Sequence, residues 1–423
     1  VTSIGKGSFQ YCNNLEEIKI PSFVTILKDE TFYGCNKLVS IELSPELTSI
    51  GKDCFNCCAS LKNFPVLSSV EFIGDHCFYH CTSLEKFSIP PLVKVIQSYT
   101  FAGCSLLNDV YIPPSVTLIG EGSFFDCRNL KSIQIPNSVT EIESETFRDC
   151  ISLKKVKISS SINRINNNVF RGCNSLNAIK IPSSVTLIGL CSFFKCSSLE
   201  KVELPSSLKS IGNFAFAQCE SLSNINIPSS VTMIGRDTFK NSPKLKKLEI
   251  PPDVQLINGG FNGNIIACEK ISVNKVLKGS YDGQHLLVDI EILSSVQSIG
   301  KWSFYGCSSL KNIKFQDPSS LVKIGKFAFY SCVSIENISI PSSVVSIKEG
   351  AFEECLALKE LEFQSPSSLK LIDIFAFKGC TSLFLDRIKI PDDVQCGKYA
   401  FDGCGKIVKE IPTTEVEKKC NIY

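Results

Sequence analysis

Residues 181–204, IPSSVTLIGLCSFFKCSSLEKVEL, recur along the whole chain with few changes. Near-copies begin at Ile112 (IPPSVTLIGEGSFFDCRNLKSIQI) and at Ile227 (IPSSVTMIGRDTFKNSPKLKKLEI). An internal repeat of this length is typical of solenoid proteins, in which each unit buries its apolar face only against its neighbours. The repeat therefore overrides the two or three separate domains that a chain of 423 residues would otherwise suggest.

A phenylalanine marks each unit of the repeat. In a first array the phenylalanines are 23 residues apart throughout: Phe9, Phe32, Phe55, Phe78, Phe101, Phe124, Phe147, Phe170, Phe193, Phe216 and Phe239. In a second array the spacing is 25, 23, 25 and 24 residues: Phe304, Phe329, Phe352, Phe377 and Phe401. We therefore predict a regular array over residues 1–260 and a second array over 296–411. Residues 412–423 are expected to form a charged tail.

Each unit contains the order F-x-x-C-x-x-L-x-x-I-x-I-P, followed by S-x-V-x-x-I-G. The L-x-x-I-x-I segment predicts a β-strand whose inward residues are two apart, and the proline ends its ladder. The V-x-x-I pair indicates a short outer strand, and the glycine after it suggests a turn with positive φ. The segment around the phenylalanine is long enough for one helical turn. These features predict stacked coils with a parallel β-sheet on one face, short outer strands and single helical turns.

The repeat is interrupted between the two arrays. Residues 274–300 omit one turn of the Phe-Cys type, and Asp282-Gly283 lies between apolar flanks, which is a hairpin signal. We therefore predict an irregular coil with a hairpin-like insertion over residues 261–295. This segment can be a tolerated loop, or it can be a hinge or a bracket that binds a partner.

The motifs resemble the BspA-like, treponemal-type leucine-rich repeats. The resemblance rests on the L-x-x-I-x-I strand, on the cysteine three residues before its leucine, and on the segments IPSSVT-x-IG and AF-x-x-C. It covers nearly the whole chain and implies a β-rich α/β leucine-rich repeat solenoid. It also implies a surface or secreted protein of a mucosal bacterium or protist parasite that binds host cells or matrix proteins.

The charge and hydropathy of the chain exclude several classes of partner. The sequence has 44 Lys and Arg against 42 Asp and Glu, a net charge of +2, with both signs spread along it. It lacks the basic field that nucleic acids and anionic membranes require. No apolar run is long enough to cross a bilayer, so we expect no membrane insertion by this chain. Because the sequence begins within a repeat, we expect it to be part of a longer protein, and it identifies no targeting segment.

Most of the 22 cysteines occupy one repeat position: Cys12, Cys35, Cys58, Cys81, Cys104, Cys127, Cys150, Cys173, Cys196, Cys219, Cys307, Cys332, Cys355, Cys380 and Cys404. Stacked coils would bring these residues within disulfide range. However, every coil presents its thiol in the same inward direction, and free cysteine packs as a small apolar residue. We therefore expect a buried, reduced column, with disulfides as the alternative.

One group of side chains has the spacing of a zinc site. Cys54, Cys57, Cys77 and His80 form the pattern C-x2-C-x19-C-x2-H across two successive units. The alternative is packing alone, because the position of Cys54 holds Ser, Thr or Ala in nearly every other unit. Packing is the expectation, so we predict no metal and no other cofactor.

Catalytic motifs are not evident in the sequence. The chain has three histidines, His76, His80 and His285, and its cysteines belong to repeat positions. The glycines recur as turn formers and build no phosphate-binding loop. An active site would be a local departure from the repeat with convergent polar groups. We therefore expect a protein that is not an enzyme.

The predicted sheet exposes a polar row of side chains with mixed charge. The row includes Tyr111, Lys157, Lys180 and Glu203. A small basic patch extends across three coils: Lys155, Lys157, Lys180 and Lys201. The patch is either a solvated face or a docking site for an acidic partner. Three functions remain: a surface protein that binds macromolecules, an intracellular protein-binding scaffold, and a structural spacer. The first is our expectation, with protein partners and an unknown oligomeric state.

Overall fold

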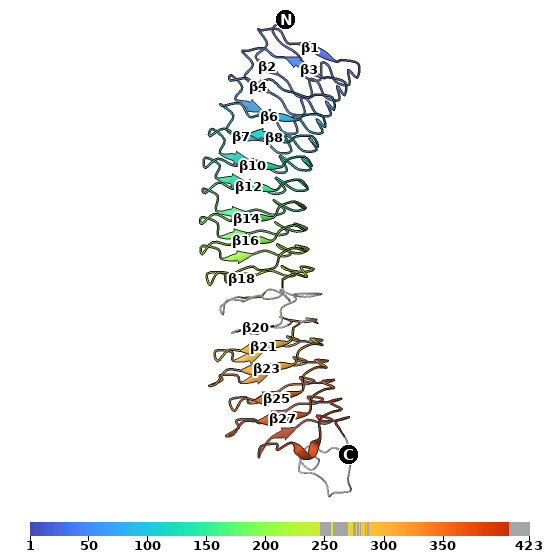
Figure 1. Ribbon diagram of the computed structural model, residues 1–423, viewed down its shortest axis with the longest axis vertical. Coiled ribbons are helices and arrows are strands. Elements are labelled where there is room, and N and C mark those ends of the chain that lie inside the picture. The colour runs from blue at the N-terminus through green and yellow to red at the C-terminus, as the bar shows by residue number, and fades with distance from the viewer. Residues whose placement is uncertain are drawn as a thin grey trace. The chain divides into compact units, whose positions relative to one another are not determined.

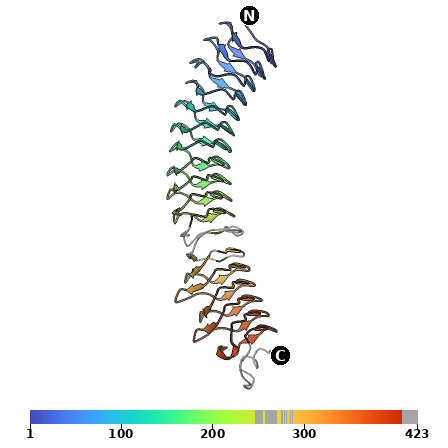
Figure 2. The ribbon, with the colours of Figure 1, turned by 45° about the vertical axis from the view of Figure 1, so that its right-hand side comes forward.

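The computed structural model describes residues 1–245, 255–256, 270–273, 276, 279, 281–283, 285 and 287–405 (Figure 1). The chain divides into two compact units, Val1–Leu222 and Ser223–Tyr423. Each unit is a parallel β-solenoid whose successive coils lie one above the other (Figure 2). The predicted solenoid is therefore confirmed. The predicted division at residues 260, 295 and 411 falls mainly on residues outside the described part, and the tail at 412–423 lies wholly outside it.

The first unit has a main strand and a two-residue outer strand in most of its coils. The main strands are β1 (Glu17–Lys19), β3 (Ser40–Glu42), β6 (Lys86–Ser88), β8 (Asp109–Tyr111), β10 (Ser132–Gln134), β12 (Lys155–Lys157), β14 (Ala178–Lys180) and β16 (Lys201–Glu203). The outer strands are β2 (Ile26–Leu27), β4 (Ser49–Ile50), β5 (Phe72–Ile73), β7 (Val95–Ile96), β9 (Leu118–Ile119), β11 (Glu141–Ile142), β13 (Arg164–Ile165), β15 (Leu187–Ile188) and β17 (Ser210–Ile211).

The second unit repeats this arrangement with longer main strands. These are β20 (Lys270–Val273), β21 (Asp289–Ile292), β23 (Asn312–Phe315), β25 (Asn337–Ile340) and β27 (Glu360–Phe363). The outer strands are β18 (Met233–Ile234), β19 (Gln255–Leu256), β22 (Ser298–Ile299), β24 (Lys323–Ile324), β26 (Ser346–Ile347), β28 (Leu371–Ile372) and β29 (Gln395–Cys396). Among the described residues the one helix is the short 3-10 helix η1 (Leu385–Arg387).

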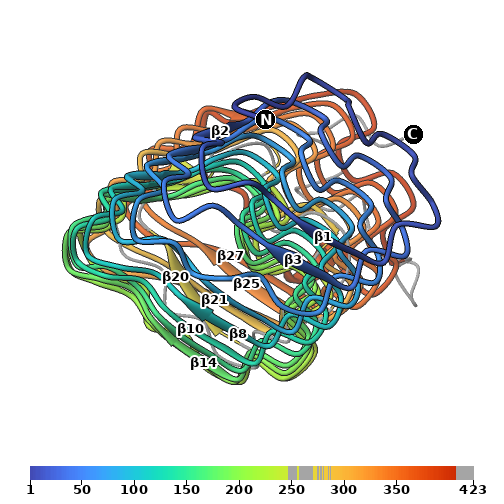
Figure 3. The same cartoon turned by 90° about the horizontal axis from the view of Figure 1, so that it is seen from above.

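The strands pair in parallel with equivalent residues side by side. Ile18 is the register partner of Ile41, and Ile290 is that of Ile313. Equivalent residues of successive coils therefore form columns, which Figure 3 shows as overlying turns. Since inward and outward residues alternate along each strand, one column of isoleucines enters the core and its neighbours face solvent.

The core of each unit is a stack of aromatic rings. In the first unit the rings from Phe9 to Phe216 lie 5.1 to 5.7 Å apart with interplanar angles of 16° or less. From Phe32 onward these side chains are completely buried. Each ring pair adds about 0.5–1.5 kcal/mol to the free energy gained by burial alone. The predicted aromatic column is confirmed.

The predicted helical turn around each phenylalanine is wrong. In the coil of Phe78, the Cys77 N–H donates to the Gly74 carbonyl at 3.3 Å, and the Cys81 N–H donates to the Phe78 carbonyl at 3.1 Å. His76 and His80 have φ values of 53° and 55°, at the third position of each turn. These left-handed residues prevent the chain from continuing as a right-handed helix. Phe and Cys still point inward together.

The glycine after the outer strand has a different role from the one predicted. Gly51, Gly120 and Gly212 do not have positive φ values. A Cβ on Gly120 would lie 2.8 Å from the Ile96 carbonyl oxygen, and one on Gly212 would lie 2.6 Å from the Gly189 carbonyl carbon. Glycine is therefore needed here because the backbones of successive coils approach each other closely.

The described residues around Asp282-Gly283, where the sequence predicts a hairpin, follow the pattern of the repeat. Tyr281 stacks on Phe304 with a centroid distance of 5.0 Å and an interplanar angle of 1°. The Tyr281 N–H donates to Ser303 and the Gly283 N–H donates to Tyr305, as in regular coils. The strands on either side, β20 and β21, pair in parallel. The described part of this segment is thus an ordinary coil in which tyrosine replaces phenylalanine.

Candidate functional site

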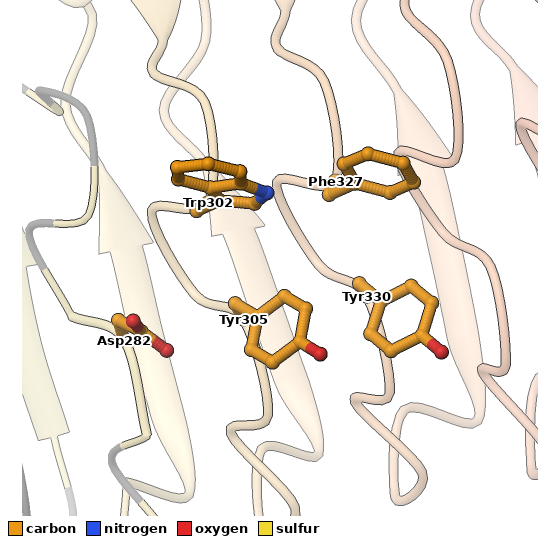
Figure 4. Close-up of a pocket in the computed structure, with 5 residues that line it drawn as sticks. All are labelled: Asp282, Trp302, Tyr305, Phe327 and Tyr330. Atoms are coloured by element: carbon orange, nitrogen blue, oxygen red, sulfur yellow. The ribbon is translucent and has the colours of Figure 1, made fainter.

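An aromatic groove lies on the surface of the second unit, at the turns beside the core column. We call the residue two before and the residue one after each core aromatic its rim positions. The groove, of about 490 Å³, is lined by rim residues of three successive coils: Asp282, Trp302, Tyr305, Phe327 and Tyr330 (Figure 4). Figure 4 shows Trp302 and Phe327 in one row and the other three in a second row. Ligand pockets of this volume are common in proteins.

The rings of the aromatic groove are held in fixed orientations. Tyr305 stacks on Tyr330 with centroids 4.8 Å apart and an interplanar angle of 7°. Phe327 meets the same Tyr330 edge to face at 5.9 Å. Trp302 and Phe327 have φ values of 58° and 52°, so both project from the left-handed position of their turns. A rigid cluster of aromatic rings can bind a planar or cationic group with little loss of conformational entropy.

Asp282 closes one end of the tyrosine row. Its carboxylate is half-buried, and this burial raises its pKa above the ordinary value of an aspartate. Among the described residues, none with a positive charge forms an ion pair with it. The aromatic groove therefore combines apolar faces with an acidic group that has no counter-charge within the described part of the chain.

The predicted partner-binding residues lie on the main strands of the first unit. Tyr111 ends β8 and is 59% exposed. Lys155 and Lys157 are the two ends of β12, and their side chains are also exposed. The structure thus places these residues on the open face of the sheet, as the alternation of the strands predicts.

The remaining residues of this set form part of the same face. Lys180 is the register partner of Glu203, which ends β16. The Lys201 Nζ atom forms an ion pair with Glu203 at 2.7 Å, and this contact lowers the pKa of the glutamate. Glu203 therefore partly neutralises Lys201 and also attracts Lys180, so the positive charge of the basic patch is greatest around Lys155 and Lys157.

The four residues with zinc-like spacing, Cys54, Cys57, Cys77 and His80, do not form a cluster. Cys54 and Cys77 are completely buried beside each other in the core. Cys57 and His80 occupy left-handed turn positions at the surface, with φ values of 60° and 55°. Across the described residues, no group of three or more Cys, His, Asp or Glu side chains is placed to hold a metal ion. The structure favours packing as the role of Cys54 and Cys77.

The cysteine column has a specific bonding role. The Cys58 thiol donates to the Phe32 carbonyl of the preceding coil at 3.2 Å, and the same bond recurs from coil to coil at 2.9 to 3.2 Å. Burial raises the pKa of Cys355 to about 12, and it also strongly raises the pKa values of Cys104 and Cys173. The predicted burial is confirmed except for Cys12, which is exposed. Outside this column, Cys396 is disulfide-bonded.

Comparison with known proteins identifies the repeat. A family model described as "BspA type Leucine rich repeat region (6 copies)" matches residues 2–119, 94–198, 163–279 and 274–408. This chain belongs to the BspA-type leucine-rich repeat family. A search of the curated proteins finds no match.

Two solved structures illustrate the similarity of this BspA-type protein to others. A leucine-rich repeat protein from Bacteroides ovatus ATCC 8483 is 27% identical, with a TM-score of 0.60 over 96% of this chain and 93% of that one. A leucine rich cell surface protein from Faecalibacterium prausnitzii A2-165 is 28% identical, with a TM-score of 0.47 over 75% and 83% of the two chains.

Sequence reasoning missed the aromatic groove of this BspA-type protein. The omission follows from treating residues 274–300 as an interruption of the repeat, which left Tyr281 outside the predicted aromatic column. Tyr281 is 23 residues before Phe304, and this spacing would have placed Asp282 in line with Tyr305.

A search for membrane-spanning helices among the described residues finds none of sufficient length and hydropathy.

Proposed function

We propose that this BspA-type protein is a non-enzymatic surface protein that binds a host-cell or matrix protein through the face of its main strands. The observation that carries the proposal is the exposed row of side chains on two pairs of main strands in register, β10 with β12 and β14 with β16. Stacked strands hold such side chains about 4.8 Å apart on a rigid support. An extended partner can therefore bind without ordering the receptor, which reduces the entropic cost of association.

The basic patch gives this face a preferred partner. Lys155, Lys157 and Lys180 are exposed on the main strands of two adjacent coils, β12 and β14. Neighbouring positive charges attract an acidic surface and accelerate its association at low ionic strength. We therefore propose an acidic region of a protein as the group that binds here.

A capture experiment tests the binding face. The purified protein is immobilised and exposed to a detergent extract of host cells whose surface proteins carry biotin. Replacing Lys157, Lys180 and Lys201 by Glu should reduce capture about fivefold or more. Each exposed charge in such an interface contributes up to about 1 kcal/mol to the binding free energy.

The control places the same kind of change on the opposite side of the coil. Lys94→Glu together with Lys209→Glu alters exposed lysines next to the outer strands β7 and β17. This double variant should capture as much as the unaltered protein. Equal losses in both variants, or no loss in either, would show that the main-strand face is not the binding face.

Surface location is tested independently by antibody staining. Intact cells that produce the full-length protein should stain as strongly as permeabilised cells. Staining only after permeabilisation would favour the alternative, an intracellular protein-binding scaffold. That alternative draws on the free cysteines of the column, which a reducing compartment preserves.

A further inference from the structure

The rim positions of the first unit already pair guanidinium groups with aromatic rings. The Arg148 Cζ atom lies 5.3 Å from the ring centroid of Phe125, and that of Arg171 lies 5.2 Å from the ring centroid of Phe194. All four residues directly follow a core phenylalanine, and each pair belongs to adjacent coils. The Arg148 guanidinium also donates to the Glu145 carboxylate at 3.1 Å. The solenoid edge thus binds a guanidinium between a ring and an acid.

The aromatic groove also contains an aromatic ring and a carboxylate, but no guanidinium lies between them among its lining residues. Asp282, Tyr305 and Tyr330 directly follow the core aromatics of three adjacent coils. Since Tyr330 covers one face of Tyr305, the other face is turned toward the coil of Asp282 (Figure 4). Asp282 and Tyr305 are therefore related as Arg171 and Phe194 are, except that an acid stands where the arginine would be.

We propose that the aromatic groove binds an arginine side chain of the protein partner, with its guanidinium on the open face of Tyr305 and paired with the Asp282 carboxylate. This inference rests on the proposed function and adds a second contact to it. Arginine fits better than lysine because its guanidinium is planar, stacks on rings and pairs with a carboxylate through two N–H groups. Arginine is also enriched among the residues that dominate protein interfaces.

The rings in the second row of the aromatic groove already contact cations of the protein itself. The Lys301 Nζ atom lies 3.9 Å from the ring centroid of Trp302, and the Lys326 Nζ atom lies 5.2 Å from that of Phe327. Lys326 also forms an ion pair with Glu349 at 2.5 Å. These lysines show that the rings of this rim attract positive charge, and neither of them forms an ion pair with Asp282.

Trp302 is the single tryptophan of the chain, so its fluorescence reports on the aromatic groove directly. The probe is the pentapeptide Gly-Gly-Arg-Gly-Gly with blocked ends. Its control contains citrulline, which has the shape of arginine without the charge. We expect saturable titration by the arginine peptide and at least about tenfold weaker binding of the citrulline peptide, since charge-assisted bonds are about twice as strong as neutral ones.

Two variants assign the effect to residues. Asp282→Asn should weaken binding of the arginine peptide about tenfold, because it removes the counter-charge and preserves the shape. Glu353→Gln is the matched control, since Glu353 occupies the same rim position two coils beyond Tyr305 and does not line the groove. It should leave the affinity unchanged. Unfolding midpoints of both variants should equal that of the unaltered protein.

Three results would overturn the inference. The first is equal binding of the arginine and citrulline peptides. The second is an unchanged affinity in Asp282→Asn. The third is a Trp302 response to a neutral oligosaccharide such as maltotriose with no response to the arginine peptide, which would assign the groove to a carbohydrate.

The inference and the proposed function fail separately. If Asp282→Asn captures the host protein as well as the unaltered protein does, the arginine contact is wrong and the binding face stands. If the peptide binds as predicted and charge reversal of the basic patch leaves capture unchanged, the proposed binding face is wrong and the groove stands.

Discussion

The two units have nearly the same core and different rims. Core rings are 5.1 to 5.7 Å apart in the first unit and 5.0 to 5.2 Å apart in the second. At the rim, Arg148 covers Phe125 in the first unit, whereas Tyr330 covers Tyr305 in the second. The core positions must fit the adjacent coils, while the rim positions need only fit the left-handed turns. Differences in binding between the units are therefore expected at the rim.

The units also differ in their buried thiols, and this difference predicts an effect of pH. Among the described residues, burial raises the pKa of many thiols in the first unit: Cys54, Cys58, Cys77, Cys81, Cys104, Cys127, Cys150, Cys173, Cys196 and Cys219. In the second unit, burial raises the pKa of Cys332 and Cys355, and a hydrogen bond with Cys404 together with burial raises that of Cys380.

Alkaline pH should therefore destabilise the first unit more than the second. The unfolded chain releases these protons near pH 9, whereas the folded chain retains them. The contribution of these thiols to the free energy of unfolding is complete below about pH 9. It falls by about 1.4 kcal/mol per thiol and pH unit as the pH rises toward the pKa of the folded state. Circular dichroism should show loss of structure between pH 9 and 11, at a lower pH than the change in Trp302 fluorescence. If circular dichroism and Trp302 fluorescence changed over the same pH range, the predicted difference between the units would be contradicted.

Removal of a core ring should destabilise both units equally. Phe147→Ala and Phe352→Ala each delete a completely buried ring from the middle of a stack. We expect each to lower the free energy of unfolding by about 3–5 kcal/mol, because a cavity remains. Urea unfolding measures this loss. A loss below 1 kcal/mol in one unit would show that its column does not hold the coils together.

The close approach of coils should also be the same in both units. A Cβ on Gly212 would lie 2.6 Å from the Gly189 backbone, and one on Gly325 would lie 2.5 Å from the Ile299 carbonyl oxygen. Each Gly→Ala change should cost about 2–3 kcal/mol by overpacking. Gly306→Ala is the control, because Gly306 has open space around it and a φ of +69°, so only about 1 kcal/mol of left-handed strain is expected. Equal losses at all three positions would refute the packing explanation.

The repeat made the core predictable from sequence and made the rim hard to predict. A spacing of 23 residues places Phe78 above Phe55 whatever the turn between them, so the aromatic and cysteine columns follow from periodicity alone. The turns do not follow from periodicity. Residues such as His76 and Trp302 adopt positive φ without being glycine, because the coil closes only with left-handed residues there. A helical turn fits the same length of chain, which explains the wrong assignment.

The aromatic groove depends on those turns. Trp302 and Tyr305 line one groove because two left-handed turns project both side chains outward at the edge of the coil. Sequence reasoning assigned no role to these positions, and it read Asp282-Gly283 by its local turn chemistry rather than by its place in the repeat. The strand face was predictable, because alternation alone exposes Lys157 and Lys180. Its partner was not, because exposure does not identify what binds.

The most direct test is to give the second unit the guanidinium that the first unit already has. Asp282→Arg places an arginine next to Tyr305 as Arg171 is placed next to Phe194. The measurement is titration of Trp302 fluorescence with the arginine pentapeptide, on protein whose unfolding midpoint matches that of the unaltered chain. We predict no change in Trp302 fluorescence at peptide concentrations that saturate the unaltered protein, because the introduced arginine side chain occupies the site. An unchanged dissociation constant for the peptide would contradict the claim that the aromatic groove binds a guanidinium at Tyr305.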